Sequence, residues 1–233
     1  MSESRQIVAE STGARVSGKA ACDVVLFGGN GVTGVVGLLV DILGLRSLAA
    51  SAAEGGGVGG EKVTTSRPAI FVGPHEHHSN LLPWRESGCE VVAVPERNDD
   101  GSVDLDELDR LLRLPEYSSP SGRLRAGAFS AASNVTGIIA DVDSISALLH
   151  RHGALAFFDY ASGAPYAKMD MNPPPPGGVG DASKDAMYFS PHKLYGGTSS
   201  PGVLVIKKRV SWCGALLSLL PRLAARFFFV LRV

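Results

Sequence analysis

Seven short apolar runs recur along the chain, and they limit the folds open to it more than any other feature. Such runs, rich in β-branched and aromatic residues and bounded by turn signals, predict strands. The expected strands cover residues 23–27, 69–73, 90–94, 126–131, 154–159, 186–189 and 202–207. Stretches with helical spacing follow the first, third and fourth runs, at residues 32–43, 105–114 and 141–153.

This alternation of strands and helices predicts an α/β fold. Helices on both faces of a mainly parallel sheet make a three-layer αβα sandwich, and we expect one seven-stranded sheet of that kind. The connection between the last two strands is too short for a crossover helix. Residues 202–207 are therefore expected to run antiparallel to their neighbour.

The sequence is expected to fall into three parts. Residues 1–22 are predicted to be an N-terminal helical lead-in, residues 23–208 a large ligand-binding domain, and residues 209–233 an apolar tail. The Ala/Gly-rich stretch 51–68 and the Pro/Gly-rich stretch 171–185 are predicted to be loops inserted between strands of the same sheet.

The composition suits a soluble globular domain without a polyelectrolyte partner. Of the 233 residues, 45% are apolar and the net charge is −1, so no nucleic-acid partner is expected. The cysteines are widely spaced and form no CxxC pair, which indicates a reducing compartment. They are Cys22, Cys89 and Cys213.

Neither end of the sequence predicts a membrane segment. The N-terminal stretch MSESRQIVAESTG lacks the apolar core of a signal peptide. Near the C-terminus, Pro221, Arg222 and Arg226 interrupt an apolar stretch, and an arginine at a helix centre costs about 2.5–3.5 kcal/mol on membrane insertion. We therefore expect a cytoplasmic protein with no membrane contact.

Polar groups follow the carboxyl ends of five of the predicted strands, where open α/β sheets bind their ligands. GGNGVTG follows the first strand, PHEHHSN the second and SNVTG the fourth. The fifth strand ends in Asp159, and the sixth runs into SPHK, residues 190–193. The sequence thus predicts a binding site at one edge of the sheet.

The GNGVTG stretch, residues 29–34, fits G-x-G-x-x-G directly after a strand and at the start of a helix. A nicotinamide-nucleotide oxidoreductase is therefore one hypothesis. A Rossmann unit also needs an acid that ends the second strand, and Glu54 instead lies in an Ala/Gly-rich loop. Under either hypothesis Gly31, Val32 and Thr33 would offer free backbone N–H groups to a phosphate, and a plain tight turn is the alternative.

Three histidines, His75, His77 and His78, stand close together in the second of these loops. A zinc site is one interpretation, but alternation in an extended loop turns neighbouring rings to different sides and no cysteine completes a site. We predict no metal. A neutral imidazole can also lie flat on an aromatic ligand, and a solvated loop histidine is the alternative for each.

Asp159 and Lys193 suggest a cofactor. Asp159 ends the most apolar strand, where a carboxylate is costly unless a cation meets it. The pyridinium nitrogen of pyridoxal phosphate (PLP) is such a cation, and a cap for the following turn is the alternative. Lys193 could bind the PLP aldehyde if desolvation or nearby positive charge removes its proton; a surface lysine is the alternative. Ser190 and His192 could hold the phosphate.

The residues resemble the class V aminotransferases, the fold-type-I PLP-dependent group that includes the cysteine desulfurases. The resemblance covers roughly residues 4–208 and rests on motifs in the order found in the family: FGGNGVTG, EHHSNLLPW, SNVTG, FDYASGAPY and SPHKLYGG. The resemblance implies that residues 23–208 are the PLP-binding large domain.

The resemblance also implies a role for each candidate residue. Lys193 would form the Schiff base with PLP and move the proton at the substrate Cα. Asp159 would keep the pyridine nitrogen protonated, His77 would stack on the ring, and Asn134 would bond the phenolic oxygen. The remaining residues would cradle the phosphate: Val32, Thr33, Ser190 and His192.

An enzyme acting on an amino acid, and a homodimer, follow from the same resemblance. Ser162 stands where desulfurases usually carry Gln. We expect the family's N-terminal segment and small C-terminal domain to be missing, together with the desulfurase's catalytic cysteine and the arginine that binds the substrate carboxylate. None of the cysteines has a matching context, so a truncated, catalytically silent fragment is the alternative.

Overall fold

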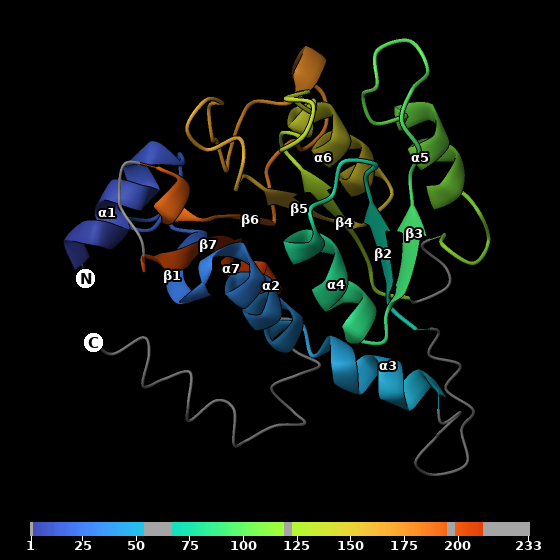
Figure 1. Ribbon diagram of the computed structural model, residues 1–233, viewed down its shortest axis with the longest axis horizontal. Helices are drawn as coiled ribbons and strands as arrows, with labels where there is room; N and C mark the ends of the chain where they lie inside the picture. Colours follow the sequence, from blue (N-terminus) through green and yellow to red (C-terminus); the bar gives the residue numbers. More distant parts are fainter. Residues whose placement is uncertain (1, 54–66, 119–122, 195–198, 212–233) are drawn as a thin grey trace.

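The seven predicted strands form one sheet with the order β1-β7-β6-β5-β4-β2-β3 (Figure 1). The computed structural model describes residues 2–53, 67–118, 123–194 and 199–211. The strands are β1 (Asp23–Asn30), β2 (Ala69–Val72), β3 (Glu90–Ala93), β4 (Arg125–Ser130), β5 (Leu155–Asp159), β6 (Ala186–Phe189) and β7 (Pro201–Lys207). Strands β2 to β6 are parallel, whereas β7 is antiparallel to both β1 and β6. The predicted architecture and the antiparallel last strand are confirmed.

Helices cover both faces of the sheet (Figure 1). One face carries α2 (Gly31–Ile42), α3 (Leu45–Ala53) and α4 (His78–Glu86). The other carries α1 (Ser2–Ser11), α5 (Leu105–Leu112) and α6 (Val142–Arg151). Three short elements complete the structure: the 3-10 turns η2 (Pro176–Gly178) and η3 (Pro191–Lys193), and α7 (Lys208–Ser211).

The sheet separates two apolar clusters, one beneath each layer of helices. Side chains alternate along a strand, so successive residues of β5 enter different clusters. Phe157 stacks on Trp84 of α4, with ring centroids 6.1 Å apart, while Phe158 faces the α5 and α6 side. Burial on both faces explains why these strands appear in the sequence as continuous apolar runs.

Two helices that the sequence analysis did not predict lie on the α2 face. The helix α3 ends at Ala53, inside the stretch 51–68 that we expected to be a loop, and α4 starts at His78 in the expected extended loop. The reason for α4 is local: His77 is its N-cap, and the His77 side chain accepts a hydrogen bond from the Ser79 N–H.

Several predictions fall on residues outside the described ranges, among them Glu54 and the apolar tail beyond Ser211. The helix α1 lies within the expected lead-in, but the three-part division of the chain stays a prediction. Among the residues that the structure describes, no single helix has the length and apolarity to span a bilayer. The pair α2 and α3 meets both criteria only across a 56° bend.

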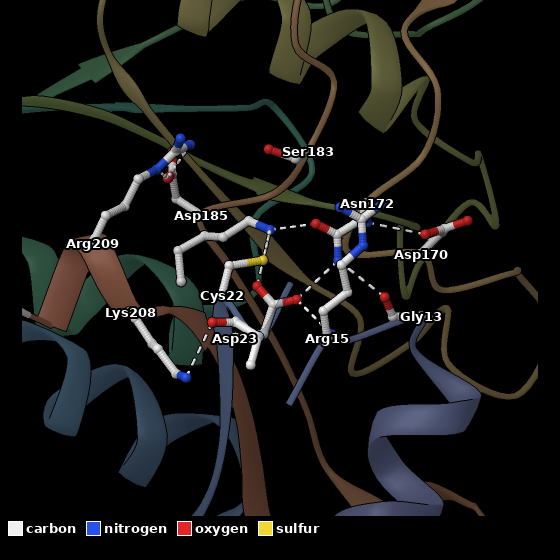
Figure 2. A network of polar contacts seen from close by, with 12 residues as sticks. Gly13, Arg15, Cys22, Asp23, Asp170, Asn172, Ser183, Asp185, Lys208 and Arg209 are labelled. Atoms are coloured by element: carbon white, nitrogen blue, oxygen red, sulfur yellow. Dashed lines mark hydrogen bonds and ion pairs between the residues drawn. The ribbon is translucent and has the colours of Figure 1, made fainter. Parts of the chain in front are cut away.

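A buried polar network joins the chain segments at the edge opposite the carboxyl ends of the parallel strands (Figure 2). Asp23 starts β1 and Lys207 ends β7, and their charged atoms lie 2.9 Å apart. Both residues are buried, at 1% and 5% exposure. Asn172 donates to the Asp23 carboxylate at 2.8 Å and accepts a hydrogen bond from Lys207. This network attaches the 171–185 segment to the first and last strands.

The buried pair gives a prediction about stability. Asp23→Leu alone should lower the free energy of unfolding by about 3–5 kcal/mol, because Lys207 stays buried without its counter-charge. Asp23→Leu combined with Lys207→Met should be less destabilised than Asp23→Leu alone. Urea unfolding measures both. Lys168→Met, which breaks an exposed ion pair with Asp170, is the control and should cost at most about 1 kcal/mol. A double variant less stable than Asp23→Leu would contradict the prediction.

Candidate cofactor site at the carboxyl edge of the sheet

The carboxyl ends of β1, β2, β4, β5 and β6 lie at one edge of the sheet. Because β7 is antiparallel to both β1 and β6, those two strands point the same way as the parallel set. The five polar segments singled out in the sequence therefore follow strand ends on a common edge.

A close-packed glycine turn connects β1 to α2. Gly31 has a φ of +59°, which an L side chain rarely adopts. A Cβ on Gly31 would lie 2.6 Å from Ser190 Oγ and 2.9 Å from His192 Cε1. The backbone of this turn therefore comes against the segment that follows β6. The first turn of α2 carries N–H groups without helical partners, which suits an anion.

Ser190 ties the end of β6 to the start of α2. Its side chain is buried, and its Oγ accepts a hydrogen bond of 2.9 Å from the Val32 N–H. The expectation of a free Val32 N–H was therefore wrong, because the Ser190 hydroxyl already occupies this donor. The hydroxyl proton of Ser190 remains able to donate to a ligand.

Asp159 is buried at the end of β5, with 3% exposure. Its Oδ1 accepts a 2.7 Å hydrogen bond from the Ala161 N–H, so the turn-capping alternative is confirmed for one oxygen. Within the described residues, Oδ2 has no hydrogen-bond partner. Loss of hydration raises the pKa of Asp159 to about 6, although the Ala161 N–H and the charge of Lys193 act in the opposite direction.

Lys193 ends the 3-10 turn η3, and its N–H donates to the Ser190 carbonyl at 3.0 Å. Its charge lowers the pKa of both Asp159 and His77, so the lysine lies within electrostatic range of these two residues. The Lys193 side chain is exposed, which differs from the desolvated surroundings that we expected.

His77 lies at the N-terminus of α4, which is next to that of α2. Its Nδ1 accepts from the Ser79 N–H at 3.2 Å, and Thr33 Oγ1 of α2 donates to Ser79 Oγ at 3.0 Å. Partial burial lowers the pKa of His77, and the charges of Lys193 and His78 lower it further. A neutral imidazole is thus favoured here.

The three neighbouring histidines do not converge. His75 Nε2 contacts the Gly101 carbonyl at 2.7 Å, while the rings of His77 and His78 are tilted by 57° with centroids 6.0 Å apart. Across residues 2–53, 67–118, 123–194 and 199–211, no three His, Cys, Asp or Glu side chains gather as metal ligands would.

Asn134 is separate from the other predicted site residues. It is exposed in the turn after β4, and no hydrogen bond within the described residues joins it to them. Together with Ser162, Ile139 and Tyr166 it lines a cavity of about 340 Å³. The remaining predicted residues are linked by the contacts and charges described above: Gly31, Val32, Thr33, His77, Asp159, Ser190, His192 and Lys193.

Sequence reasoning missed Glu76. Its carboxylate accepts hydrogen bonds from the Ser130 N–H and hydroxyl, both at 2.8 Å, and from Asn80 Nδ2 at 2.6 Å. Loss of hydration raises the Glu76 pKa to about 7, and repulsion by Asp159 adds to the rise. A signal in the sequence was the spacing of four residues between Glu76 and Asn80, which allows their side chains to hydrogen-bond at the start of a helix. This signal can be used only if α4 is predicted.

The sheet order argues against a dinucleotide site at GNGVTG. In a Rossmann fold the strand before the glycine turn lies inside a parallel sheet. Here β1 is an edge strand of the sheet formed by the described residues, where it pairs only with the antiparallel β7.

Residues 58–212 match the family described as aminotransferase class-V, about two thirds of the chain. The chain belongs to this family. The match confirms the resemblance inferred from the motifs. Members of the class V family use pyridoxal phosphate.

Curated relatives in the class V family include cysteine desulfurases. A probable cysteine desulfurase of Halalkalibacterium halodurans is 32% identical over 143 residues, which cover 60% of this chain and 31% of the relative. A probable cysteine desulfurase 2 of Mycobacterium leprae is 31% identical over 227 residues, covering 93% of this chain and 46% of the relative. The chain thus spans about a third to a half of the length of these class V relatives.

Solved structures share the fold of this class V chain. The cysteine desulfurase CsdA (S-sulfonic acid) from Escherichia coli has a TM-score of 0.64 and 24% identity, covering 90% of this chain and 43% of that one. Oryza sativa TDC with PLP and tryptamine also has a TM-score of 0.64, at 15% identity, covering 88% and 41% of the two chains.

The raised pKa of Glu76 predicts a pH-dependent stability. The folded chain binds this proton more tightly than the unfolded chain, whose pKa is near 4.5, so stability falls as pH rises toward 7. Between pH 5 and pH 7.5 this group should cost about 2 kcal/mol, and Glu76→Gln should remove that part of the slope. Urea unfolding at the two pH values measures it.

The control for this prediction is Glu86→Gln, the same chemical change at an exposed position of α4. Wild type and Glu86→Gln should share one slope, and Glu76→Gln should have a shallower one. Equal slopes in all three proteins would show that Glu76 titrates as an ordinary glutamate.

Proposed function

We propose that this class V chain binds PLP at the carboxyl edge of the sheet and acts on an amino acid through Lys193. The observation that carries the proposal is the joining of Lys193, Asp159 and the Gly31 turn at one edge. Two features of the structure fit PLP. The glycine turn brings the start of α2 against Ser190 and His192, an approach that a Cβ on Gly31 would block, and within the described residues Asp159 Oδ2 accepts no hydrogen bond.

The proposed phosphate site is the start of α2 with the segment after β6. Backbone N–H groups at a helix N-terminus and the hydroxyl of Ser190 donate to an anion, and His192 adds a ring N–H. The Val32–Ser190 hydrogen bond keeps these two segments together before any ligand arrives. Gly31 and Thr33 complete the proposed set.

The proposed ring site lies between His77 and Asp159. When bound, PLP supplies an aldehyde that a lysine amine can attack and a cationic ring that withdraws electrons from the substrate. Asp159 would hold the proton on the ring nitrogen, since a nearby cation lowers the pKa of this acid and keeps it ionised. His77, favoured as neutral, would present its flat face to the ring.

Lys193 is the proposed nucleophile and base. Its amine must be neutral to attack the aldehyde, and later it would take the proton from the substrate Cα. Lys193 is exposed at the end of η3, so a ligand can reach it from solvent. Asn134 remains the proposed partner of the phenolic oxygen and is the member that no described contact connects to the others.

The proposed substrate is an amino acid, and the proposed assembly is a homodimer in the cytoplasm. Cysteine is the substrate class suggested by the names of the curated relatives. A catalytically silent protein that still binds PLP is the second candidate. Binding without turnover of any amino acid would favour this second candidate.

The proposed role of Lys193 predicts a covalent label. PLP added to the full chain and reduced with borohydride should be found on the peptide that contains Lys193. The variant Lys193→Ala should lose the label and the accompanying absorbance near the edge of the visible range. The control is Lys168→Ala, because Lys168 is an exposed lysine paired with Asp170. A label elsewhere, or none in the wild type, would contradict the proposal.

The proposed phosphate site predicts an effect of Gly31→Ala. The added methyl group would displace Ser190 and His192, and the loss of about one hydrogen bond to the ligand should weaken PLP binding by about tenfold. Spectroscopic titration measures the affinity. Gly37→Ala, in the same helix with nothing near its Cβ position, should bind PLP as the wild type does. Equal affinities for the two variants would place the phosphate elsewhere.

A further inference from the structure

Among the described residues, the Glu76 side chain makes more hydrogen bonds than the side chain of any residue assigned above. Its Oε1 accepts from the Ser130 N–H at 2.8 Å and from the Gly73 N–H at 3.3 Å. Its Oε2 accepts from Asn80 Nδ2 at 2.6 Å and from the Ser130 hydroxyl at 2.8 Å. A carboxylate has about four acceptor positions, and all of them face donors here. These donors favour the ionised form, burial opposes it more strongly, and a proton on Glu76 could be donated to the Ser130 hydroxyl oxygen.

The contacts continue through Asn80 to the strand beside Asp159. Asn80 is buried, and its Oδ1 accepts from Tyr188 Oη at 2.5 Å and from Trp84 Nε1 at 3.3 Å. Two donors fix the Asn80 oxygen, so its amide N–H₂ must point to Glu76. Tyr188 lies opposite Asp159 in the β5–β6 pairing. One chain of hydrogen bonds thus runs from β6 through α4 and Glu76 to the end of β4.

These hydrogen bonds act on two parts of the proposed PLP site. Glu76 holds the β2–α4 turn against Ser130, and the next residue, His77, is the N-cap of α4. Glu76 also lies close enough to Asp159 for the two negative charges to repel each other. It therefore holds the residue proposed for the ring face and acts through its charge on the acid proposed for the ring nitrogen.

Several titratable groups face Glu76 from neighbouring elements. Asp159 of β5 adds negative charge near it, and Tyr188 of β6 is a neutral phenol whose pKa is raised by burial first and then by both acids. His77 and His78 precede Asn80 at the start of α4, and Lys193 after β6 supplies the positive charge that reaches Asp159 and His77. A cation bound beside Asp159 would relieve the repulsion between the two acids.

We propose that Glu76 is a positioning residue of the PLP site, which orients His77 through the β2–α4 turn and whose ionisation is coupled to ligand binding at Asp159. This inference rests on the proposed function. Binding of a cationic ring beside Asp159 would favour the ionised form of Glu76, so the proton that Glu76 carries near neutral pH would be released to solvent. Ligand affinity should therefore rise with pH across the range in which Glu76 titrates.

Pyridoxine 5′-phosphate is the probe for the test, because it has the ring nitrogen and phosphate of PLP but no aldehyde to bind Lys193. Its affinity for the full chain is measured by fluorescence at pH 6.5, 7.5 and 8.5. A group with a pKa of about 7 that becomes fully ionised on binding adds about a fourfold rise between the end points. Wild type and the control Glu86→Gln should show this rise, and Glu76→Gln should lack it.

The pH profile separates positioning by a charge from a purely structural role. If Glu76 only held the turn, Glu76→Gln would weaken binding by the same factor at every pH, and that result would overturn the inference. Glu76→Asp, which keeps the charge, should retain the pH-dependent rise with weaker binding throughout. If both Glu76→Asp and Glu86→Gln lost the pH-dependent rise in affinity, that result would also overturn the inference. The rise would then not depend on the charge of Glu76.

A measurement on the wild type covers the case in which Glu76→Gln does not fold. Carbon-13 NMR of labelled glutamate side chains should show one carboxyl that titrates near pH 7 without ligand and at a much lower pH with saturating pyridoxine 5′-phosphate. The absence of such a change would contradict the coupling. Failure of the proposed function looks different, because the wild type would then bind neither probe nor PLP and Lys193 would carry no label.

Discussion

The hydrogen bond between the Val32 N–H and Ser190 Oγ joins two segments that are 158 residues apart in the sequence, and the candidate site depends on it. It places the positive end of the α2 dipole against the turn that carries Lys193. The approach is possible because Gly31 and its neighbour Gly202 carry no side chains. A Cβ on Gly31 would strike Ser190, and one on Gly202 of β7 would lie 2.2 Å from the Gly31 carbonyl oxygen.

Much of the fold could be predicted from local sequence patterns. Strands β2, β4, β5, β6 and β7 are buried on both faces and so appear as apolar runs, and the short link before β7 predicted its direction. The helix α4 could not be found in this way. Its sequence, HSNLLPWRE, contains a proline and lacks a clear apolar stripe, and the helix is held by contacts of Asn80 and Trp84 with distant strands.

The site was predictable to the extent that its residues follow strand ends. Asp159, Ser190 and Lys193 occupy such positions, and the topology brings them to one edge. Glu76 could not be assigned, because three of its four donors lie on β4 and on a helix that the sequence did not predict. The exposure of Lys193 was also unpredictable, since burial depends on which segments cover a turn.

The antiparallel pairing of β1 with β7 has a consequence for the order of folding. Asp23 pairs with Lys207, and the sheet offers β1 no other neighbour within the described residues. The glycine turn at the end of β1 is therefore synthesised well before β7, and it can acquire its native surroundings only after β7 has followed. Until β7 emerges from the ribosome, β1 is an apolar strand with both edges unpaired, and such strands associate readily with other chains.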